Sequence, residues 1–421
     1  MKIAIIGGGV SGLVAAHLLH RTGVHDVTLF ERGDQLGGHA HTVEVEDERG
    51  ASHAVDTGFI VHNDRNYPCF QRLLEQLGVA TQPAPMSFGV ADAVGDFEYN
   101  GASPNGLYAK RAHLVTPWFQ RMVADLVRFN REARELLGTS AGEWDPSLRE
   151  YLAARRYSDA FVERLIVPQA SAVWSADPEQ LWRFPARFLV EFFDNHGMLG
   201  LRDRPQWRTI DGGSRRYVEA IAARLGERRV RVATPVEAVS RHPDRVEVTP
   251  RGCAPERFDH VVIAAHADQA LRLLSDPRER ELELLGAFPY QRNDVVLHTD
   301  RGLLPRRRRA WASWNYHLTE RATGRPTVTY HLNRLQALRG AGREYLVTLN
   351  RADDVRGEHV IERFAYDHPV YTRAGTAAQR RWEELDGVGR TSFCGAYWGW
   401  GFHEDGVRSA LRACARFGGR L

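Results

Sequence analysis

The sequence has little lysine and cysteine and no long apolar run. Lys2 and Lys110 are the only lysines, so the 56 basic residues that face 53 acidic ones are nearly all arginines, and the net charge is +3. This near-neutral balance gives no support to nucleic-acid binding. No C-x-x-C pair occurs among Cys69, Cys253, Cys394 and Cys414, which argues against a metal site and a disulfide framework.

The absence of an 18-residue apolar stretch predicts that no helix of the chain crosses a membrane. The N-terminal apolar run is similar to a signal peptide, but the glycines from Gly7 to Gly12 argue against one. We therefore expect a cytoplasmic protein with free thiols, and peripheral membrane contact stays open. With 421 residues the chain can bury a large core, so two domains are expected.

The N-terminus carries the pattern of a nucleotide-binding strand–helix–strand unit. An apolar strand is followed by glycines in G-x-G-x-x-G spacing, an apolar helix, a second strand and an acid. These parts are Lys2–Ile6, then Gly7, Gly9 and Gly12, a helix capped by Gly23, the strand Val27–Phe30, and Glu31.

Each residue of this motif has a separate physical role. Gly7 permits a tight turn, Gly9 lets the backbone approach a pyrophosphate, and Gly12 lets the helix pack closely on the strand. The helix N-terminus offers unpaired N–H groups and a positive dipole end to the phosphates. Glu31 lies 19 residues after Gly12, where a carboxylate can bind ribose hydroxyls.

A second glycine doublet favours FAD over NAD as the cofactor. Gly37-Gly38 follows shortly after Glu31 and lets another backbone segment approach the same molecule. A further apolar strand with a glycine is expected over residues 55–60, which read Val-Asp-Thr-Gly-Phe-Ile.

On these residues the chain resembles the flavin-containing amine oxidoreductases and phytoene-desaturase-like enzymes, and within them a bacterial subgroup of predicted NAD/FAD-binding proteins. In that superfamily a Gly-Gly-Arg doublet follows the acid, and here His39 replaces the arginine. Residues 233–239 resemble the strand whose backbone meets the adenine, residues 258–265 a returning strand, and residues 391–406 the closing flavin motif.

The resemblance implies FAD as cofactor and a set of residues that contact it. Gly395 approaches the phosphates, and a final helix that starts near Phe402 points its N-terminus at the flavin ring. The implied cofactor residues are Gly7, Gly9, Gly12, Glu31, Arg32, Gly38, His39, Gly58, Phe59, Ile60, Val236, Gly395, Phe402 and His403.

We expect an α/β fold with a discontinuous, Rossmann-like FAD-binding domain and a substrate domain of mixed sheet plus helical cap. The FAD domain is expected over residues 1–70, 205–270 and 385–421, and the substrate domain over 71–204 and 271–384. Apolar periodicity predicts helices over 68–77, 118–137 and 186–196, and strands over 294–299, 311–316, 327–332 and 345–349.

One absence bears on the chemistry. Many amine oxidases of this superfamily carry a lysine in the substrate-domain sheet, and this chain has none after Lys110. We therefore expect an FAD-dependent oxidoreductase that removes hydride from a C–H bond of an apolar or lipid-like small molecule, as an oxidase or desaturase. Amine or amino-acid oxidation, a redox-neutral isomerase or mutase, and a non-catalytic flavin-binding subunit stay open as alternatives.

Sequence patterns alone identify the catalytic side chains poorly, because flavin itself carries out hydride transfer. His403, inside the closing motif, is a candidate acid or base, and His62, which follows the Gly58–Ile60 segment, is a second candidate. The aromatic residues at 174, 182, 184, 188, 192, 193, 311, 314, 316, 398 and 400 form either an apolar substrate tunnel or ordinary core.

A run of four arginines, Arg306, Arg307, Arg308 and Arg309, concentrates positive charge in the second half of the chain. Such a run is a solvated loop or a docking patch for an acidic carrier protein or an anionic membrane surface.

Overall fold

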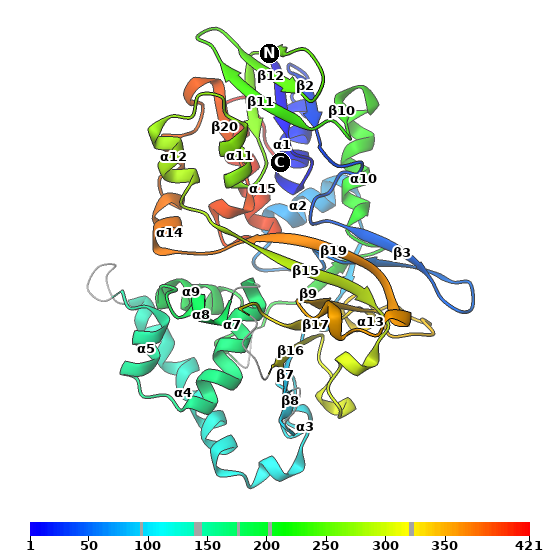
Figure 1. Ribbon diagram of the computed structural model, residues 1–421, viewed down its shortest axis with the longest axis vertical. Coiled ribbons are helices and arrows are strands. Elements are labelled where there is room, and N and C mark those ends of the chain that lie inside the picture. The colour runs from blue at the N-terminus through cyan, green and yellow to red at the C-terminus, as the bar shows by residue number, and fades with distance from the viewer. Residues whose placement is uncertain (93–95, 139–144, 175–176, 201–203, 320–323) are drawn as a thin grey trace.

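The computed structural model describes residues 1–92, 96–138, 145–174, 177–200, 204–319 and 324–421, which form two stacked layers (Figure 1). Both termini lie in the upper layer, and two long strands, β15 and β19, run between the layers. In the described part of the chain no helix is both long and apolar enough to cross a membrane.

The upper layer is built on a five-stranded sheet in which every neighbouring pair is parallel. Its order is β10 (Val230–Arg231), β2 (Asp26–Phe30), β1 (Lys2–Ile6), β14 (His260–Ile263) and β20 (Thr391–Phe393). All five strands fall within the three segments expected for the FAD domain, whose boundaries stay a prediction.

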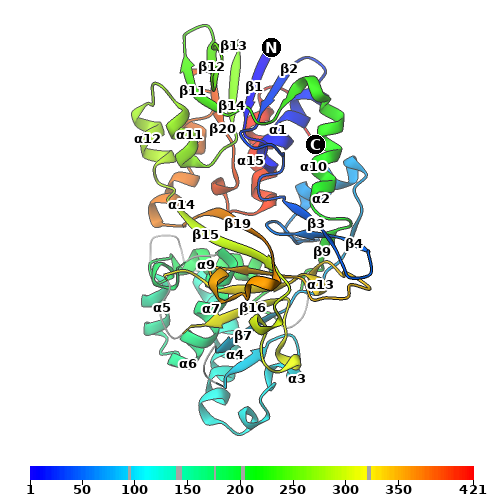
Figure 2. The ribbon, with the colours of Figure 1, turned by 45° about the vertical axis from the view of Figure 1, so that its right-hand side comes forward.

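The alternation of β1 explains why this sheet is covered on both faces. Ile3 and Ile5 pack on one side with helices α1, α2, α10 and α15, whereas Ala4 and Ile6 pack on the other with the sheet β11–β13 and helices α11 and α12. Figure 2 shows these two groups of helices on opposite sides of the strands. The helices are α1 (Val10–Arg21), α2 (Pro68–Leu77), α10 (Arg215–Leu225), α11 (Ala267–Leu273), α12 (Glu279–Leu285), α14 (Arg373–Gln379) and α15 (His403–Ala415). The antiparallel strands are β11 (Val236–Arg241), β12 (Val246–Pro250) and β13 (Glu256–Phe258).

The lower layer is a seven-stranded mixed sheet with a helical cap. Its strands pair antiparallel except for β16 with β7, which are parallel. The order is β19 (Val360–Pro369), β15 (Tyr290–His298), β18 (Leu346–Leu349), β17 (Val328–His331), β16 (Trp314–Leu318), β7 (Phe88–Asp92) and β8 (Glu98–Asn100). The helices of this layer are α3 (Pro104–Leu107), α4 (Pro117–Gly138), α5 (Leu148–Ala154), α6 (Asp159–Phe161), α7 (Val167–Trp174), α8 (Pro178–Leu181), α9 (Ala186–Asn195) and α13 (Leu332–Leu335).

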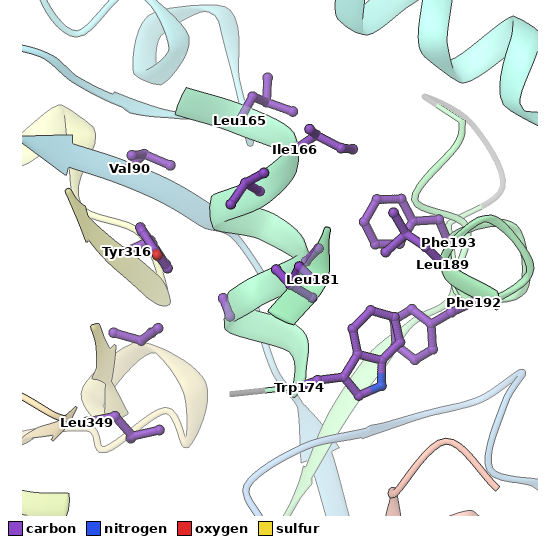
Figure 3. Packing of buried hydrophobic residues seen from close by; sticks show 14 of the residues in the cluster. Val90, Leu165, Ile166, Trp174, Leu181, Leu189, Phe192, Phe193, Tyr316 and Leu349 are labelled. Atoms are coloured by element: carbon purple, nitrogen blue, oxygen red, sulfur yellow. The ribbon is translucent and has the colours of Figure 1, made fainter. Parts of the chain in front are cut away.

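One apolar cluster joins this sheet to its cap. In Figure 3, Leu165, Ile166 and Leu181 lie between Tyr316 and Leu349 of the strands and Leu189 and Phe192 of α9, and the ring of Trp174 points toward Phe192. The expected α/β fold with a mixed sheet and helical cap is therefore confirmed. The helices expected over 68–77, 118–137 and 186–196 correspond to α2, α4 and α9.

Smaller strands link the layers. The hairpin β3 (Thr42–Glu46) and β4 (Ser52–Asp56) and the sheet β5 (His62–Asn63), β9 (Trp207–Ile210) and β6 (Thr81–Pro83) lie beside the cofactor layer. The apolar strand expected over 55–60 ends at Asp56, after which the chain turns.

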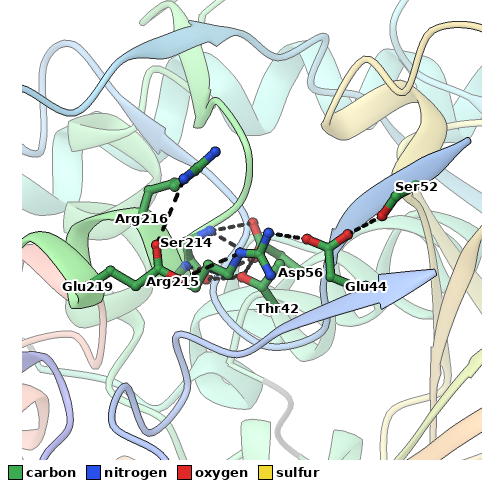
Figure 4. Close-up of polar contacts among 8 residues, drawn as sticks. All are labelled: Thr42, Glu44, Ser52, Asp56, Ser214, Arg215, Arg216 and Glu219. Carbon is green, nitrogen blue, oxygen red and sulfur yellow. Dashed lines mark hydrogen bonds and ion pairs between the residues drawn. The ribbon is translucent and has the colours of Figure 1, made fainter. Parts of the chain in front are cut away.

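Asp56 fastens this hairpin to the start of α10 (Figure 4). Its buried carboxylate accepts bonds from the Ser214 backbone N–H (2.9 Å), the Ser214 hydroxyl (2.8 Å), the Thr42 hydroxyl (2.6 Å) and Nε2 of Gln336 (3.0 Å). Burial raises the pKa of Asp56 to about 6. One carboxylate thus connects three segments that are distant in sequence.

Candidate functional site

A single cavity of about 1120 Å³ extends from the glycine-rich turn into the lower layer. Ligand pockets usually have volumes of about 300–1,000 Å³, so this one has room for a dinucleotide and a second molecule. Its walls come from β1, α1, β2, the β11 region, the 395–403 segment, α9 and the floor of the seven-stranded sheet.

The glycine-rich turn has the geometry that its sequence predicts. Gly7 has a φ of +108°, and a Cβ there would lie 2.6 Å from the carbonyl oxygen of Ala264. A Cβ on Gly12 would lie 1.8 Å from the carbonyl oxygen of Gly7, so only glycine lets α1 start this close to the turn. Around Gly9 a Cβ would meet no described atom within 4 Å, which leaves open space where a pyrophosphate would lie.

The second doublet closes onto this turn. The Gly37 N–H donates to the carbonyl of Gly8 at 2.8 Å, and a Cβ on Gly38 would lie 3.2 Å from Cα of Gly9. Two backbone segments thus face the same part of the cavity. This is the geometry expected for a second contact with a dinucleotide.

Glu31 lies at the end of β2 and lines the cavity together with Arg32. Its Oε2 accepts the Gly8 N–H at 2.6 Å and its Oε1 accepts the Gly33 N–H at 2.7 Å. Because each carboxylate oxygen has two lone pairs, both oxygens can also accept ribose hydroxyls. Val236, expected at the adenine, lines the far end of the same cavity.

The other end of the cofactor groove is formed by Gly58, Phe59, Ile60, Gly395, Phe402 and His403, all of which line the cavity. Helix α15 begins at His403, and its partial positive N-terminus stabilises negative charge placed near it. The Phe402 N–H donates to the Asp405 carboxylate at 3.0 Å, which fixes the turn before the helix.

His403 is a packed, neutral residue. Its ring stacks on Phe59 with the centroids 3.5 Å apart, and its Nε2 lies 3.1 Å from the Tyr217 hydroxyl. Burial lowers the pKa of His403 to about 3. The imidazole is therefore uncharged at physiological pH.

His39, which stands where the superfamily has arginine, belongs to a cluster of rings on the cavity wall. Its ring centroid lies 5.0 Å from Tyr366, 5.4 Å from His368 and 6.1 Å from His266. Burial and the neighbouring histidines lower the pKa of His39 well below its ordinary value. Its Nε2 is buried without a partner among the described residues. The fixed cation of the superfamily is therefore replaced by a neutral donor or acceptor.

Beyond the cofactor groove the cavity opens into an aromatic chamber. Of the aromatic residues singled out in the sequence, Trp174, Phe192, Trp314 and Trp400 line it, whereas Phe184, Phe188, Phe193, Trp311, Tyr316 and Trp398 lie in apolar clusters. Trp182 packs under the guanidinium of Arg149.

Several chamber residues were not predicted. Met86, Phe88, Trp207 and Tyr330 complete the aromatic and apolar wall, and His196 and Arg204 add polar side chains. They come from strands and loops spread over the chain, and no local spacing relates them. Where β15 and β18 form the floor, the cavity-lining side chains are Val295 and Leu349.

Two predicted site residues, Gly12 and His62, do not line the cavity. Gly12 acts through packing, as described above. His62 is buried against Tyr67 and Phe70, and burial lowers its pKa to about 4. Lys110 forms an ion pair with Asp96 at 2.7 Å, outside the cavity. No described lysine therefore reaches the chamber.

The arginine run is only partly free to meet a partner. Arg307 donates to Glu98 at 2.8 Å and pairs with Asp96 at 2.7 Å. Arg308 lies over the ring of Trp311, while Arg306 and Arg309 are exposed. Among the described residues no group of histidine, cysteine and acidic side chains has the arrangement of a metal site.

Comparison with known proteins agrees with this geometry. The profile of the family described as "Flavin containing amine oxidoreductase" matches residues 10–417. A tryptophan 2-monooxygenase from Allorhizobium ampelinum is 31% identical over 184 residues, which are 43% of this chain and 24% of that protein. The chain thus spans about a quarter of that curated relative's length.

Two solved structures have the same fold over nearly the whole chain. Cyclohexylamine oxidase from Brevibacterium oxydans superposes with a TM-score of 0.69 at 19% identity, covering 99% of this chain and 98% of that one. A CLA-producing fatty acid isomerase from P. acnes superposes with a TM-score of 0.67 at 17% identity, with the same coverage.

Proposed function

Because the chain belongs to the family of flavin-containing amine oxidoreductases, we propose that it is an FAD-dependent enzyme that oxidises a C–H bond of a small molecule with an apolar body. Its cofactor is FAD. The observation that carries the proposal is the aromatic chamber, which is continuous with the cofactor groove and lined there by Trp174, Phe192, Trp314 and Trp400.

FAD, when bound, supplies the acceptor for the hydride. The protein supplies binding and orientation. The glycine-rich turn and Glu31 would hold the nucleotide half, and Phe59, Phe402 and the start of α15 would hold the ring half. Since His403 is neutral and already bonded to Tyr217, we assign it a positioning role rather than proton transfer.

The apolar wall of the chamber would keep water away from the reacting carbon. Phe192 of α9 stacks on Phe402 of the closing motif with centroids 5.3 Å apart, and Trp400 of the same motif lies edge-on to Phe192 at 6.0 Å. Val295 and Leu349 make the floor apolar. A wall of this composition favours a hydrocarbon or aromatic group over a charged one.

Oxidation of an amine or amino acid is the second candidate. The similarity to a tryptophan 2-monooxygenase supports it, and the aromatic chamber is compatible with an indole ring. The apolar floor and the absence of a described lysine in the chamber favour the first candidate. A redox-neutral isomerisation and a non-catalytic flavin-binding subunit are separate outcomes of the test below.

The test is anaerobic mixing of the holoprotein with decanoate, decylamine and L-tryptophan, followed by the flavin absorbance. Bleaching by decanoate supports oxidation of an apolar chain, and bleaching by decylamine or tryptophan alone overturns it in favour of amine oxidation. Conversion of linoleate only after prior reduction of the flavin indicates an isomerase. No reaction of any probe indicates a binding subunit.

Delivery of substrate by an acidic carrier protein or an anionic membrane, through Arg306–Arg309, is a further part of the proposal. Reversal of the exposed pair Arg306 and Arg309 to glutamate should leave turnover of free substrate unchanged and weaken turnover of substrate presented on anionic vesicles. Equal kinetics with both modes of delivery would remove this part of the proposal.

A further inference from the structure

The charges that line the cavity are distributed unevenly. The acids on its wall are Glu31, Glu237 and Asp367. Glu31 and Glu237 lie at the nucleotide end, where Glu237 pairs with Arg251 at 2.9 Å. Burial lowers the pKa of His266, and the charge of the nearby Asp367 raises it to a smaller extent. None of the described acids on the cavity wall thus belongs to the aromatic chamber.

The chamber carries one guanidinium. Arg32, Arg251 and Arg272 line the nucleotide end, while Arg204 lines the cavity next to Pro205, Gln206 and Trp207, which lie with His196 at the chamber's outer edge. Arg204 is exposed, so it marks the mouth of the chamber rather than its floor.

The backbone around Arg204 is held in place from two sides. A Cβ on Gly197, which has a φ of +65°, would lie 2.8 Å from Cδ of Pro205 and 3.4 Å from Cα of Arg204, so the turn after α9 packs directly on this segment. On the other side, the Gln206 N–H donates to the Asp64 carboxylate at 2.9 Å, and the Asp64 N–H donates to the Gln206 carbonyl at 3.2 Å.

The Arg204 guanidinium has hydrogen-bond donors that no described residue uses. Its Nε donates to the Gly200 carbonyl at 3.1 Å, and no described residue accepts a hydrogen bond from its two terminal nitrogens. Planar donors of this kind match a carboxylate.

From this mouth a series of rings leads to the closing flavin motif. His196 lies 6.3 Å from Trp207 and 6.0 Å from Phe402, measured between ring centroids. Burial lowers the pKa of His196 to about 4, so the imidazole is neutral and adds no charge to the path. A ligand that fits has an apolar body inside and an anionic group at the rim.

We propose that Arg204 anchors the carboxylate of an amphipathic substrate, so that the enzyme acts on apolar carboxylic acids rather than on simple amines. The inference rests on the proposed function for the location of the reacting carbon. It assigns Arg204 a role in specificity, because a protonated amine would meet the positive rim without an acid on the chamber wall to pair with.

The test uses the holoprotein and three probes of equal length: decanoate, decan-1-ol and decylamine. Binding is measured by the change in the visible flavin spectrum, with no need for turnover. Decanoate should bind about tenfold more tightly than decan-1-ol, as expected for a charge-assisted hydrogen bond at a partly exposed site. Its binding should weaken as salt is raised.

The variant Arg204→Gln should bind decanoate and decan-1-ol equally, and Arg204→Lys should keep part of the preference. Arg216→Gln, on the exposed surface of α10 and outside the cavity, is the matched control and should behave as wild type. Tightest binding of decylamine, a carboxylate preference that survives in Arg204→Gln, or no spectral change with any probe would each overturn the anchor.

Because this readout is binding, its failure is separable from that of the proposed function. A protein that prefers decanoate through Arg204 but shows no bleaching with any substrate keeps the anchor and loses the oxidation. A protein that oxidises decanoate equally well without Arg204 keeps the oxidation and loses the anchor.

Discussion

Two side chains at opposite ends of the cofactor groove, Glu31 and His403, are held by different interactions. Glu31 accepts two backbone N–H groups and lies at the ribose site that we propose, whereas His403 is a neutral ring held by stacking on Phe59. The two residues therefore respond differently to substitution.

Replacement of Glu31 by alanine should weaken FAD binding by at least about tenfold, because it removes an ionic acceptor from ribose and from two backbone N–H groups. The measurement is titration of deflavinated protein with FAD. Asp34→Ala, an exposed acid three residues later in the chain, is the control and should leave the affinity unchanged. Equal affinities of Glu31→Ala and wild type would contradict the ribose assignment.

The pH dependence of flavin reduction should contain no titration from His403. Because its pKa lies at about 3, the ring is neutral throughout pH 5–9, and protonation begins only well below this window. The variant His403→Phe, which keeps a ring on Phe59 and loses the bond to Tyr217, should reduce the rate without changing the shape of the profile. Loss of a pH-dependent step in this variant would restore His403 as an acid or base.

Sequence reasoning worked best at residues whose role is steric. Gly7, Gly9 and Gly12 form a local pattern whose spacing prescribes the turn, and the structure has that turn. His39 was noted as a departure from arginine, but its cluster with His266 and His368 joins segments more than two hundred residues apart along the chain. No local spacing carries such information.

At the scale of elements, helix α15 is the part of the fold that most directly joins the ends of the chain. It packs along α1, where a Cβ on Gly406 would lie 2.7 Å from Cγ1 of Val10 and 3.0 Å from Oγ of Ser11. Glu404 at its start accepts the Phe70 N–H of α2 at 2.9 Å. The position of α15 therefore controls the first turn of α1.

Gly406→Ala should destabilise the protein by about 1–3 kcal/mol, as expected for overpacking, and should lower FAD affinity because the start of α1 must shift. Gly138→Ala, at the end of α4, adds a methyl that meets no described atom within 4 Å and should be neutral or slightly stabilising. Thermal unfolding and FAD titration of both variants give the comparison. Identical behaviour of the two alanine variants would contradict the close crossing of α1 and α15.

The junction at Asp56 should make stability depend on pH. A carboxyl whose pKa rises from 3.8 to about 6 on folding favours the protonated form, so its contribution is fully present below about pH 4 and is lost as the pH rises through 6. The shift of about two units corresponds to about 3 kcal/mol. Between pH 4 and 7 the wild type should therefore lose about 3 kcal/mol more of its unfolding free energy than Asp56→Asn.

Urea unfolding at the two pH values, with saturating FAD, measures this difference. Asp405, whose pKa is raised by burial to about 7, contributes in the same direction in both proteins and cancels in the comparison. If the unfolding free energies of wild type and Asp56→Asn changed equally with pH, protonation of Asp56 would not contribute to stability.

Among the elements, those with strong local signals were predicted and those defined by partners were not. Helix α2 has apolar residues at Phe70, Leu73, Leu74 and Leu77, which gives a clear helical stripe, and its bounds match the expectation. Strand β19 reads Val-Ile-Glu-Arg-Phe-Ala-Tyr-Asp-His-Pro, without apolar alternation, and it forms through its nine-residue register with β15. Tertiary pairing overrides weak propensity there.

At the scale of the whole molecule, the cavity lies where the two layers meet. Its nucleotide end depends on segments from both ends of the chain, and its chamber depends on a sheet floor and a helical cap. The glycine motifs in the sequence predicted the nucleotide end of the cavity. Trp174, Phe192, Trp314 and Trp400 were expected in a substrate tunnel or in the core, and the sequence could not decide between the two, because these residues share no spacing and meet only after the layers pack.

The measurement that tests the central claim most directly is a titration of the deflavinated protein with FAD, followed by decanoate, with the visible spectrum recorded throughout. We predict that each chain binds one FAD with a shifted flavin spectrum, and that decanoate shifts the spectrum again because the chamber opens onto the flavin ring. This account would be contradicted by a chain that binds no FAD. It would also be contradicted by a bound flavin whose visible spectrum does not change when a ligand is added to the chamber.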